Sequence, residues 1–452
     1  MTWLKLSQIA EMTGGVLHGD DSFVESISTD SRTVQSDQLF IAIAGERFDA
    51  HDFVQGISNK AAAALVHKKI DCELPQIVVD DTLQALGVFA KAWRQQFFKP
   101  VIGLTGSNGK TTVKEMLAAI LACKGNVMAT FGNLNNDIGL PLTLLRLRDS
   151  DDYAVIEMGA NHFGEIDYLS NITQPNVAIL NNAGAAHLEG FGDVKGVSRA
   201  KAEIFSGLAD DGVAIINIDD KYADYWLSCN KERKVICFGF ADSADVKGEI
   251  INAGLSLQIA GKKTNIKLAL QGRHNVMNAL AASAAAVAVG LGLDEIKQGL
   301  ESLQAVKGRL APMAGLQGIQ VIDDTYNANP DSARVAIDVL AEKQQGKRVL
   351  ILGDMGELGD NSQQLHAEIG QYAKKKGIEG LYCLGDYSKQ ACQEFGDSGY
   401  SFDEIDPLLD QLKQGIEQSM TVLVKGSRSM RMERVVEALT DIQIKNEAVT
   451  AC

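Results

Sequence analysis

The chain has 452 residues, a formal net charge of -15 and a sequence pI near 5.0. Because proteins that bind DNA or RNA need a basic face, this charge argues against a nucleic-acid partner. A composition of 46% hydrophobic and 22% charged residues is typical of soluble globular proteins, and the length corresponds to roughly two to four domains.

The cysteines and the N-terminal segment indicate a reducing compartment. Seven cysteines are scattered without a C-x-x-C pair, which argues against a disulfide framework or a zinc knuckle. The opening MTWLKLSQIAEMTGG lacks the apolar segment of a secretory signal, and no apolar run reaches the ~18 residues that a membrane helix needs. We therefore expect a soluble, cytoplasmic protein without membrane insertion.

The hydrophobic runs divide the chain into three predicted α/β domains. Residues 1–82 have short apolar runs, QLFIAIAG and AAAALVH, separated by polar turns, and form a small α/β module. Residues 83–311 repeat β-branched runs that stop at Gly, Asn or Asp (PVIGLTG, YAVIEMGA, NVAILNNAG, VAIINIDD), and helical patterns follow several of them. This alternation predicts a doubly wound parallel sheet with its ligand site at the carboxyl ends of the strands.

Residues 312–452 follow a predicted linker, KGRLAP at 307–312, in which Gly308 is expected to act as a hinge. The runs IQVIDDTYN, VLILGDMGEL, GLYCLGD and TVLVKGSRS again look like strands that end in polar loops. They predict a second doubly wound unit, a Rossmann-like C-terminal domain.

The segment VIGLTGSNGKTTVKEM predicts a phosphate-binding loop between a strand and a helix. Its glycines allow close approach to anions, and the amides at the helix start favour phosphate. In the usual G-x-x-x-x-G-K-[ST] pattern, Lys110 reaches the β- and γ-phosphates and Thr111 binds Mg²⁺; here Leu104 replaces the first glycine, so the loop is shorter. A chance Gly/Ser turn is the alternative. The predicted nucleotide contacts are Gly106, Ser107, Asn108, Gly109, Lys110, Thr111 and Thr112.

Three later residues suggest a metal site beside this loop. Glu157 ends an apolar strand, and a carboxylate there suits Mg²⁺, although it could be an ordinary strand-end acid. His187 follows another strand and a Gly/Ala-rich loop, where a structural histidine is the more common case. Lys201 and Glu203 are predicted to lie early in a helix, and their spacing alone favours two charged residues on the solvent-exposed face of that helix.

At this point the motifs carry a resemblance. In order, TGSNGKTT, IEMGAN, AAHLEGFG, KAEIF, GRHNVMNALAA and KGRL resemble the Mur ligase family, the ATP-dependent amide-forming enzymes of peptidoglycan synthesis. GERFDAH, GNLNNDIGLP, DDTYNANPDS, GDMGELG and KGSRS are similar to the members that join D-alanyl-D-alanine to UDP-N-acetylmuramoyl-tripeptide. The resemblance covers nearly the whole chain.

The resemblance implies ATP, two Mg²⁺ ions and a CO₂-derived carbamate on Lys201. Carbamylated Lys201, His187 and Glu157 would hold one Mg²⁺, and Thr111 and Glu157 would lie near the second. It also implies that Asn275 contacts adenine, that Arg309 reaches the phosphates, and that Asp324 lies on the ribose side, with the register against Asp323 left open.

The remaining implied contacts concern the two other substrates. The sequence does not encode the oligomeric state, and we expect a monomer, because one chain with three domains would hold the whole site. For the UDP-sugar we expect Ser31, Arg32 and Arg47, although surface salt bridging would also explain the arginines. Asn135 and Asn136 would contact substrate or complete a tight turn. Residues expected to receive the dipeptide are Asn327, Asn329, Lys425 and Arg428, although asparagines in turns are commonly structural.

Three alternatives stay open at this level. A folylpolyglutamate synthase-like ligase would share the loop and the lysine but would act on a folate. A Mur ligase that adds a single amino acid would differ only in its acceptor. A regulatory ATPase would hydrolyse ATP without an acceptor carboxylate and would leave Lys201 unmodified.

Overall fold

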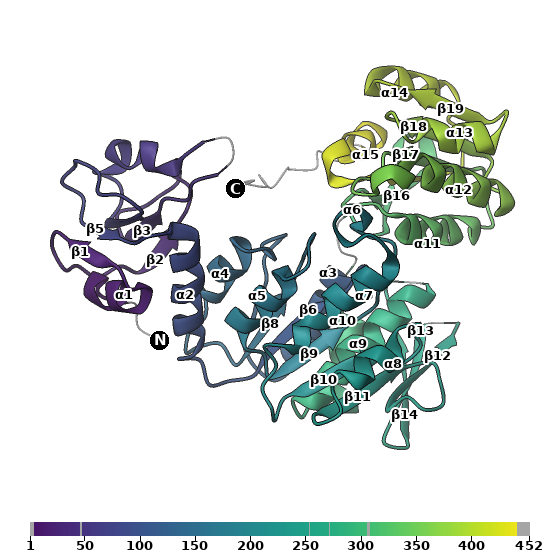
Figure 1. Ribbon diagram of the computed structural model, residues 1–452. Helices are drawn as coiled ribbons and strands as arrows, with labels where there is room; N and C mark the ends of the chain where they lie inside the picture. Colours follow the sequence, from purple (N-terminus) through teal and green to yellow (C-terminus); the bar gives the residue numbers. More distant parts are fainter. Residues whose placement is uncertain (1–3, 46–47, 253, 271, 305–307, 441–452) are drawn as a thin grey trace.

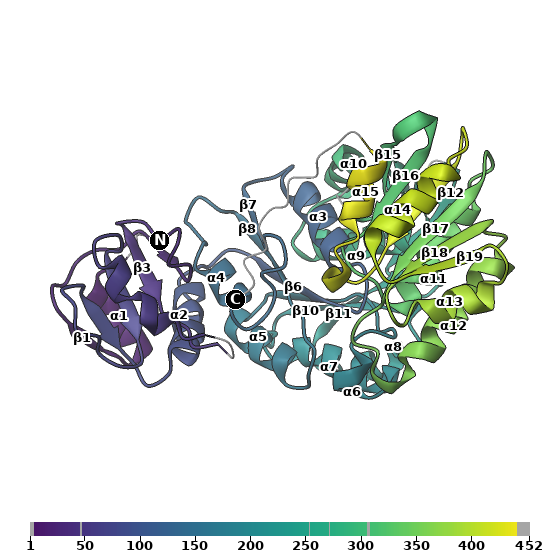
Figure 2. The ribbon, with the colours of Figure 1, turned by 90° about the horizontal axis from the view of Figure 1, so that it is seen from above.

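The computed structural model describes residues 4–45, 48–252, 254–270, 272–304 and 308–440. These residues form three α/β units, each built around its own sheet (Figure 1). We call them the N-terminal unit (α1 to β5), the central unit (β6 to α10) and the C-terminal unit (β15 to α15). Figures 1 and 2 both place the central unit between the other two.

The N-terminal unit has a five-stranded sheet in the order β1-β5-β4-β3-β2, parallel except for β1. Alternate side chains of β3 and β4 enter different cores on the two faces of this sheet. Its elements are α1 Leu6–Thr13, β1 Val16–His18, β2 Ser26–Ser28, β3 Gln38–Ile41, η1 Ala50–Phe53, η2 Gln55–Ile57, β4 Ala63–Val66 and β5 Gln76–Val78.

The central unit has a nine-stranded sheet in the order β14-β13-β12-β11-β10-β9-β6-β8-β7. Strands β7 to β12 pair in parallel, and β13 and β14 extend the edge as an antiparallel ribbon. Its strands are β6 Val101–Thr105, β7 Val127–Ala129, β8 Tyr153–Glu157, β9 Val177–Leu180, β10 Val213–Asn217, β11 Lys234–Gly239, β12 Val246–Ile251, β13 Gly254–Ile259 and β14 Lys262–Lys267.

Helices cover both faces of the central sheet, as its fully buried parallel strands require. One face carries α3 and α9, whose apolar side chains share a core with the strands. The helices are α3 Lys110–Leu121, α4 Gly139–Leu144, α5 Glu165–Thr173, α6 Leu188–Phe191, α7 Val194–Ala202, η3 Glu203–Phe205, α8 Ala223–Ser228, α9 Arg273–Ala288 and α10 Leu293–Ser302.

The C-terminal unit has a six-stranded sheet in the order β15-β16-β20-β17-β18-β19, parallel except for β15. Its elements are β15 Ala311–Ala314, η4 Leu316–Gly318, β16 Gln320–Asp324, α11 Pro330–Ala341, β17 Arg348–Gly353, η5 Gly359–Asn361, α12 Ser362–Lys375, β18 Gly380–Leu384, α13 Lys389–Phe395, β19 Gly399–Phe402, α14 Ile405–Gln414, β20 Thr421–Lys425, η6 Arg428–Met430 and α15 Glu433–Leu439.

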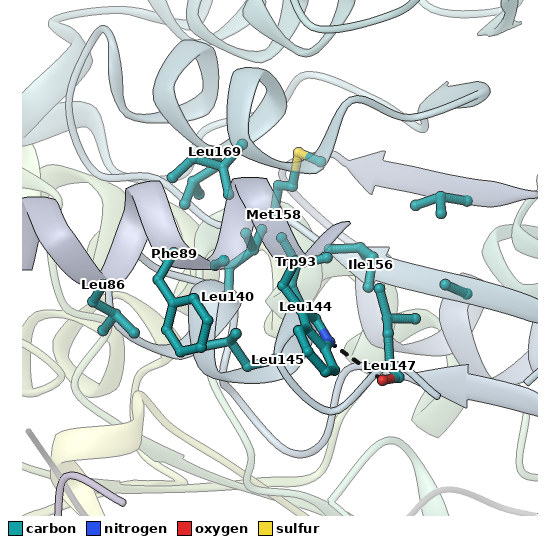
Figure 3. Packing of buried hydrophobic residues seen from close by; sticks show 14 of the residues in the cluster. Leu86, Phe89, Trp93, Leu140, Leu144, Leu145, Leu147, Ile156, Met158 and Leu169 are labelled. Carbon is teal, nitrogen blue, oxygen red and sulfur yellow. Dashed lines mark hydrogen bonds between the residues drawn. The ribbon is translucent and has the colours of Figure 1, made fainter. Parts of the chain in front are cut away.

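Helix α2 (Thr82–Arg94) joins the N-terminal unit to the central unit. Asp81 caps its start by accepting hydrogen bonds from the N–H groups of Leu83 and Gln84. The helix packs against α1 on one side and against α4 and α5 on the other. Figure 3 shows Trp93 of α2 among leucines of the central unit, where its Nε1–H donates to the Leu147 carbonyl at 3.3 Å. One continuous core thus holds the two units together.

The α/β architecture with parallel sheets agrees with the sequence, and each run predicted as a strand contains one. Two features differ. Ala311 and Pro312, assigned to the linker, already belong to β15, because they pair with Asp323 and Ile322 of β16. The ribbon β13–β14 was not predicted, because five of the six residues of β14 are polar and give no apolar strand pattern. Among the described helices, none is long and apolar enough to cross a membrane.

Candidate active site

The predicted phosphate loop connects β6 to α3, and its shape depends on Gly109. This residue has φ +78°, and an added Cβ would lie 2.3 Å from Asn278 Oδ1. Only glycine fits a left-handed position with so close a neighbour. The loop therefore turns sharply into α3, whose first residue is Lys110 and whose first turn buries Thr112.

A group of asparagines behind the loop holds its backbone. The Asn108 N–H donates to Asn182 Oδ1 at 2.9 Å, and the Asn108 carbonyl accepts from the side chains of Asn181 and Asn182, each at 3.0 Å. Ser107 Oγ accepts from the Gly184 N–H at 2.9 Å. Sequence reasoning did not select Asn181 and Asn182. Their adjacent amides directly after β9, in ILNNAG, were the available signal.

Lys110 and Thr111 lie where the loop enters the helix. Lys110 Nζ folds back and donates to the Gly106 carbonyl at 2.7 Å. Burial lowers the pKa of Lys110, and the Glu157 carboxylate opposes this shift. Thr111 Oγ1 donates to Glu157 Oε2 at 3.1 Å and accepts from the guanidinium of Arg309 at 3.2 Å. The loop, the strand-end acid Glu157 and the linker arginine Arg309 thus meet at Thr111.

Glu157 is 1% exposed at the end of β8, and its carboxylate is held by neutral donors. Asn135 Nδ2 donates to Oε1 at 2.8 Å, in addition to the Thr111 hydroxyl on Oε2. The Glu157 N–H donates to Thr130 Oγ1 at 2.9 Å. No salt bridge to Glu157 occurs within the described parts of the chain. An oriented, buried carboxylate beside a hydroxyl suits a hard divalent cation.

Lys201 is fully buried, and the structure corrects its predicted position in the chain. It lies in the last turn of α7, not early in a helix, and Glu203 follows in η3. The helix starts earlier than predicted because Asp193 caps it by accepting from the Gly196 N–H. Lys201 Nζ donates to the Ala160 carbonyl at 3.4 Å and lies 5.4 Å from the ring centre of Phe191. Burial lowers the pKa of Lys201 to about 7, and the nearby Lys110 adds to the shift.

His187 lies in a left-handed conformation, φ +53°, immediately before α6. Its Nδ1 lies 2.6 Å from Glu357 Oε2, so an acid of the C-terminal unit reaches the candidate metal site. The contact with His187 lowers the pKa of Glu357. Glu357 lies in the GDMGELG segment, but it was not predicted as a site residue, because a contact between distant loops leaves no local pattern in the sequence.

The residues expected around the nucleoside lie at the entry to α9 and at the linker. Asn275 is buried in the first turn of α9, and its Oδ1 accepts from Asn278 Nδ2 at 3.3 Å. The guanidinium carbon of Arg309 lies 3.9 Å from the ring centre of Tyr326. This stacking orients Arg309 toward Thr111.

The two adjacent acids of β16 have separate partners. Asp323 accepts from the N–H of Gly308 at 3.1 Å and from the Thr325 hydroxyl at 2.6 Å, so it fastens the linker. Asp324 Oδ2 accepts from Lys425 Nζ at 2.5 Å, and burial raises the pKa of Asp324. Asp324 and Lys425 thus form one buried pair. The ribose register left open by the sequence stays a prediction.

The other residues expected to receive the dipeptide have structural partners. Asn329 caps α11 by accepting from the Ser332 N–H at 2.9 Å, and Asn327 Oδ1 accepts from the Ala328 N–H at 2.9 Å. The Asn327 carbonyl also accepts from Lys425 at 3.0 Å. Arg428 donates to Glu433 at 3.0 Å. Their proposed substrate contacts are untested predictions.

The two asparagines after β7 have different roles. Asn135 orients Glu157, as described above, whereas Asn136 Oδ1 accepts from the Gly139 N–H at 2.8 Å and completes the turn into α4.

Two of the three residues expected near the UDP-sugar are described in the N-terminal unit. Ser31 and Arg32 lie in the turn after β2. Arg32 makes a two-point contact with Asp30, with Nε and NH2 at 2.8 and 2.7 Å, and its side chain is 73% exposed. Arg47 lies outside the described residues.

Comparisons with known proteins cover nearly the whole chain. Family models match at residues 23–94 (Mur ligase family, catalytic domain), 104–286 (Mur ligase middle domain) and 308–428 (Mur ligase, glutamate ligase domain). The chain is 46% identical over 450 residues to the UDP-N-acetylmuramoyl-tripeptide–D-alanyl-D-alanine ligase of Escherichia coli, covering 98% of this chain and 99% of that protein.

Solved structures agree with this similarity. A crystal structure of MurF from Acinetobacter baumannii matches with a TM-score of 0.92 at 39% identity, covering 98% of this chain and 100% of that one. MurF ligase from Thermotoga maritima, in complex with ADP, matches with a TM-score of 0.81 at 28% identity, covering 91% and 96%. Given these full-length matches and the phosphate loop at the centre of the fold, the chain belongs to the Mur ligase family.

Proposed function

We propose that this chain is an ATP-dependent ligase that joins D-alanyl-D-alanine to UDP-N-acetylmuramoyl-tripeptide and so forms the pentapeptide precursor of peptidoglycan. The observation that carries the proposal is the full-length similarity to enzymes named for this reaction, together with Glu157, Arg309 and the phosphate loop meeting at Thr111. The Thermotoga relative binds ADP, which supports the assignment of the loop to ATP.

The reaction has two steps. A terminal carboxylate oxygen of the tripeptide attacks the γ-phosphorus of ATP, the bond to the β–γ bridging oxygen breaks, and ADP leaves an acyl phosphate behind. The free amine of the dipeptide then attacks the acyl carbon, the C–O bond to phosphate breaks, and the amide and inorganic phosphate are released. The ammonium of the dipeptide gives up one proton to solvent before the attack, and the nitrogen loses a second proton to solvent as the amide forms. The protein chiefly positions the reactants and neutralises charge.

This chain's residues supply most of that neutralisation. The amides of the loop at 106–109 and the start of α3 face the phosphates. Lys110 gives up its contact with the Gly106 carbonyl and reaches the β- and γ-phosphates. Arg309 of the linker, stacked on Tyr326 of the C-terminal unit, brings a second cation. Asn275 is assigned to adenine and Asp324 to the ribose side.

The residues present fit two Mg²⁺ ions. The buried Glu157 carboxylate, already oriented by Asn135 and Thr111, offers two oxygen atoms. We assign Glu157, His187 and carbamylated Lys201 to one ion, and Thr111 with Glu157 to the neighbourhood of the second. Bound there, Mg²⁺ would reduce the repulsion between the substrate carboxylate and the polyphosphate.

Lys201 is a suitable acceptor for CO₂. Carbamylation joins the neutral amine to the carbon of CO₂ and releases a proton, so it needs an uncharged nitrogen. Burial lowers the pKa of Lys201 to about 7, which leaves a large neutral fraction near neutral pH. The product carries negative charge where Lys110 lies nearby, and this converts a repelling cation into an oxygen ligand.

The three predicted domains divide the substrates. We assign residues 1–82, with Ser31, Arg32 and Arg47, to the UDP-sugar. Residues 83–311 are assigned to ATP, and Asn135 and Asn136 of this domain are candidate substrate contacts. Residues 312–452, with Asn327, Asn329, Lys425 and Arg428, are assigned to the dipeptide. The assembly is proposed to act as a monomer.

The test is phosphate release from ATP by the purified chain, with Mg²⁺ and bicarbonate. The tripeptide substrate and D-alanyl-D-alanine are supplied singly and together, and single amino acids serve as matched acceptors. Release only when tripeptide and dipeptide are both present, with a pentapeptide product by mass spectrometry, is the expected result. Release with neither substrate would show a simple ATPase, and turnover with single amino acids would show a different acceptor; both would overturn the proposal.

A further inference from the structure

The loop between β17 and α12 projects one carboxylate, that of Glu357, across the interface toward the phosphate site. Glu357 Oε2 lies 2.6 Å from His187 Nδ1 of the central unit. Its charge acts on both Lys110 and Lys201. The carboxylate therefore lies close to the place where the γ-phosphate and the activated carboxyl group would be held.

The backbone around Glu357 is strained and firmly held. Glu357 has φ +61°, a left-handed conformation that non-glycine residues rarely adopt outside functional sites. On one side, the Met355 N–H donates to His366 Nε2 at 2.9 Å, and on the other side Leu358 is buried in the core. Asp354 anchors the loop further by accepting from three consecutive backbone N–H groups, those of residues 386–388. These contacts hold the loop so that the Glu357 side chain points toward His187 of the central unit, in spite of the strained backbone.

Two other acids on this side of the C-terminal unit, Asp324 and Glu433, have partners within their own unit. Asp324 binds Lys425, and Glu433 binds Arg428. Glu357 instead pairs with a residue that the proposed function assigns to the metal. A histidine that binds a metal through one ring nitrogen can keep its other nitrogen on a carboxylate, so His187 would occupy only Oε2 of Glu357. The second oxygen, Oε1, has no hydrogen-bond partner among the described residues, and the side chain is 50% exposed. Glu357 thus keeps one carboxylate oxygen available on the side of the reaction centre.

The second substrate presents the matching charge. D-alanyl-D-alanine is a zwitterion, and its ammonium end must approach the acyl carbon beside Lys110. The cations Lys110 and Arg309 at this site would repel that ammonium unless an anion receives it. The loop that carries Ser427 and Arg428 lies against Gly356, so a cation for the other end of the dipeptide is adjacent.

Resting on the proposed function, we infer that Glu357 is the specificity-determining residue that binds the ammonium group of the incoming dipeptide. It holds the nitrogen next to the acyl phosphate, while the adjacent loop at 426–429 faces the dipeptide carboxylate. The ligand class is a primary ammonium at the end of a short peptide.

Steady-state kinetics of Glu357→Gln test this inference, because glutamine keeps the shape and removes the charge. The KM for D-alanyl-D-alanine should rise about 10- to 100-fold, the range expected for losing a charged hydrogen bond, while the KM values for ATP and tripeptide change less than about two-fold. Glu357→Asp, which keeps the charge and tolerates a left-handed backbone, should recover part of the loss. Glu189→Gln is the matched control. It removes the charge of an exposed acid whose backbone N–H donates to the Glu357 carbonyl, and it should leave all three KM values unchanged.

Calorimetry separates ammonium binding from a purely structural role. Wild-type protein should bind D-alanyl-D-alanine more tightly than its N-acetylated form, and Glu357→Gln should lose most of this preference. An equal rise in the KM values for ATP and tripeptide would assign Glu357 to closure of the interface between the units. A changed Mg²⁺ requirement alone would assign Glu357 to the metal site. Either result overturns the inference.

Failure of this inference can be told apart from failure of the proposed function. If the wild-type protein does not ligate the dipeptide at all, the proposed function fails. If the wild-type protein does ligate it and Glu357→Gln keeps the wild-type preference for the free amine, only this inference fails.

Discussion

Asn329 Nδ2 donates a hydrogen bond to Asn108 Oδ1 at 2.9 Å and so joins two residues that are 221 positions apart. Beside it, Asp331 Oδ2 accepts from the Ala185 N–H at 2.8 Å, and an added Cβ on Gly184 would lie 2.3 Å from that oxygen. The start of α11 therefore rests directly on the phosphate loop and its support. Nucleotide binding and docking of the C-terminal unit should be linked, each favouring the other.

Asn329→Ser tests this link. Serine still caps α11, but it is too short to reach Asn108, so the helix should stay intact while the contact between the units is lost. We expect the dissociation constant of a non-hydrolysable ATP analogue to rise about 3- to 10-fold by calorimetry, with the thermal midpoint nearly unchanged.

Ser332→Ala is the control for that variant. It removes the reciprocal bond that Ser332 Oγ accepts from the Asn329 N–H, but it leaves Asn108 untouched. It should lower the thermal midpoint slightly and keep nucleotide affinity. Equal losses of nucleotide affinity in Asn329→Ser and Ser332→Ala would mean that the cap of α11, and not the contact between the units, determines the conformation of the phosphate loop.

Asn135 and Asn136 form a matched pair with opposite expected effects. Asn135→Ala removes a donor from Glu157 and should lower kcat about 10- to 100-fold at little cost in stability, because the carboxylate loses its orientation. Asn136→Ala removes the acceptor for the Gly139 N–H and should destabilise the fold by about 1 kcal/mol with a smaller effect on kcat. Parallel kinetics and thermal melts of the two variants measure this, and an inactive but well-folded Asn136→Ala would contradict it.

Lys201→Ala should reduce kcat/KM by about two to three orders of magnitude, because the proposed oxygen ligand disappears. Wild-type protein equilibrated with ¹³C-bicarbonate should show one carbamate carbon signal that is lost in the variant. Lys195→Ala, an exposed position of the same helix, should keep both the signal and the activity. A wild-type spectrum without a carbamate signal would refute the assignment.

The core between α2 and the central unit should be sensitive to cavities. Leu144 is fully buried next to Trp93, so Leu144→Ala should cost about 2–5 kcal/mol of stability. Val88 of α2 is 50% exposed, and Val88→Ala should shift the urea midpoint far less. Urea unfolding followed by tryptophan fluorescence compares them, and equal shifts would mean that this core does not limit stability.

His274 should make stability depend on pH. Burial lowers its pKa to about 4, and the Lys425 cation adds to the shift. In the unfolded chain the pKa of His274 is near 6.5, so between pH 6.5 and about 4 the unfolded chain binds a proton that the folded chain does not bind. The free energy of unfolding therefore falls as the pH drops through this range, by at most about 3 kcal/mol. His274→Gln should flatten this slope in urea titrations, whereas the exposed His162→Gln should not; an unchanged slope in both would contradict the assignment.

Local patterns in the sequence were enough to predict a large part of this protein. Apolar β-branched runs predicted the central strands of the three sheets (β3 and β4; β6, β8, β9 and β10; β16, β17, β18 and β20), because burial on both faces imposes a continuous pattern that can be read over a few residues. Outer strands such as β1, β7 and β19 were not predicted, because their short, partly exposed segments lack that pattern. The loop around Lys110 and its helix were equally clear, since a phosphate loop is a local structure. Lys201 was misplaced within its helix, because the capping residue that sets the helix start, Asp193, was overlooked.

Contacts between distant segments were decided only by the tertiary structure. Glu357 beside His187 and Asn329 on Asn108 join separate units, and Arg309 on Thr111 joins the linker to the central unit. No spacing along the chain encodes such pairs. The same holds for Asp323 and Asp324, which are neighbours in sequence but point to different partners because side chains alternate along a strand. The sequence by itself thus determined the central strands, the phosphate loop and the family. The packing of the three units against one another decided which side chains meet, because that depends on where the whole chain places each strand end.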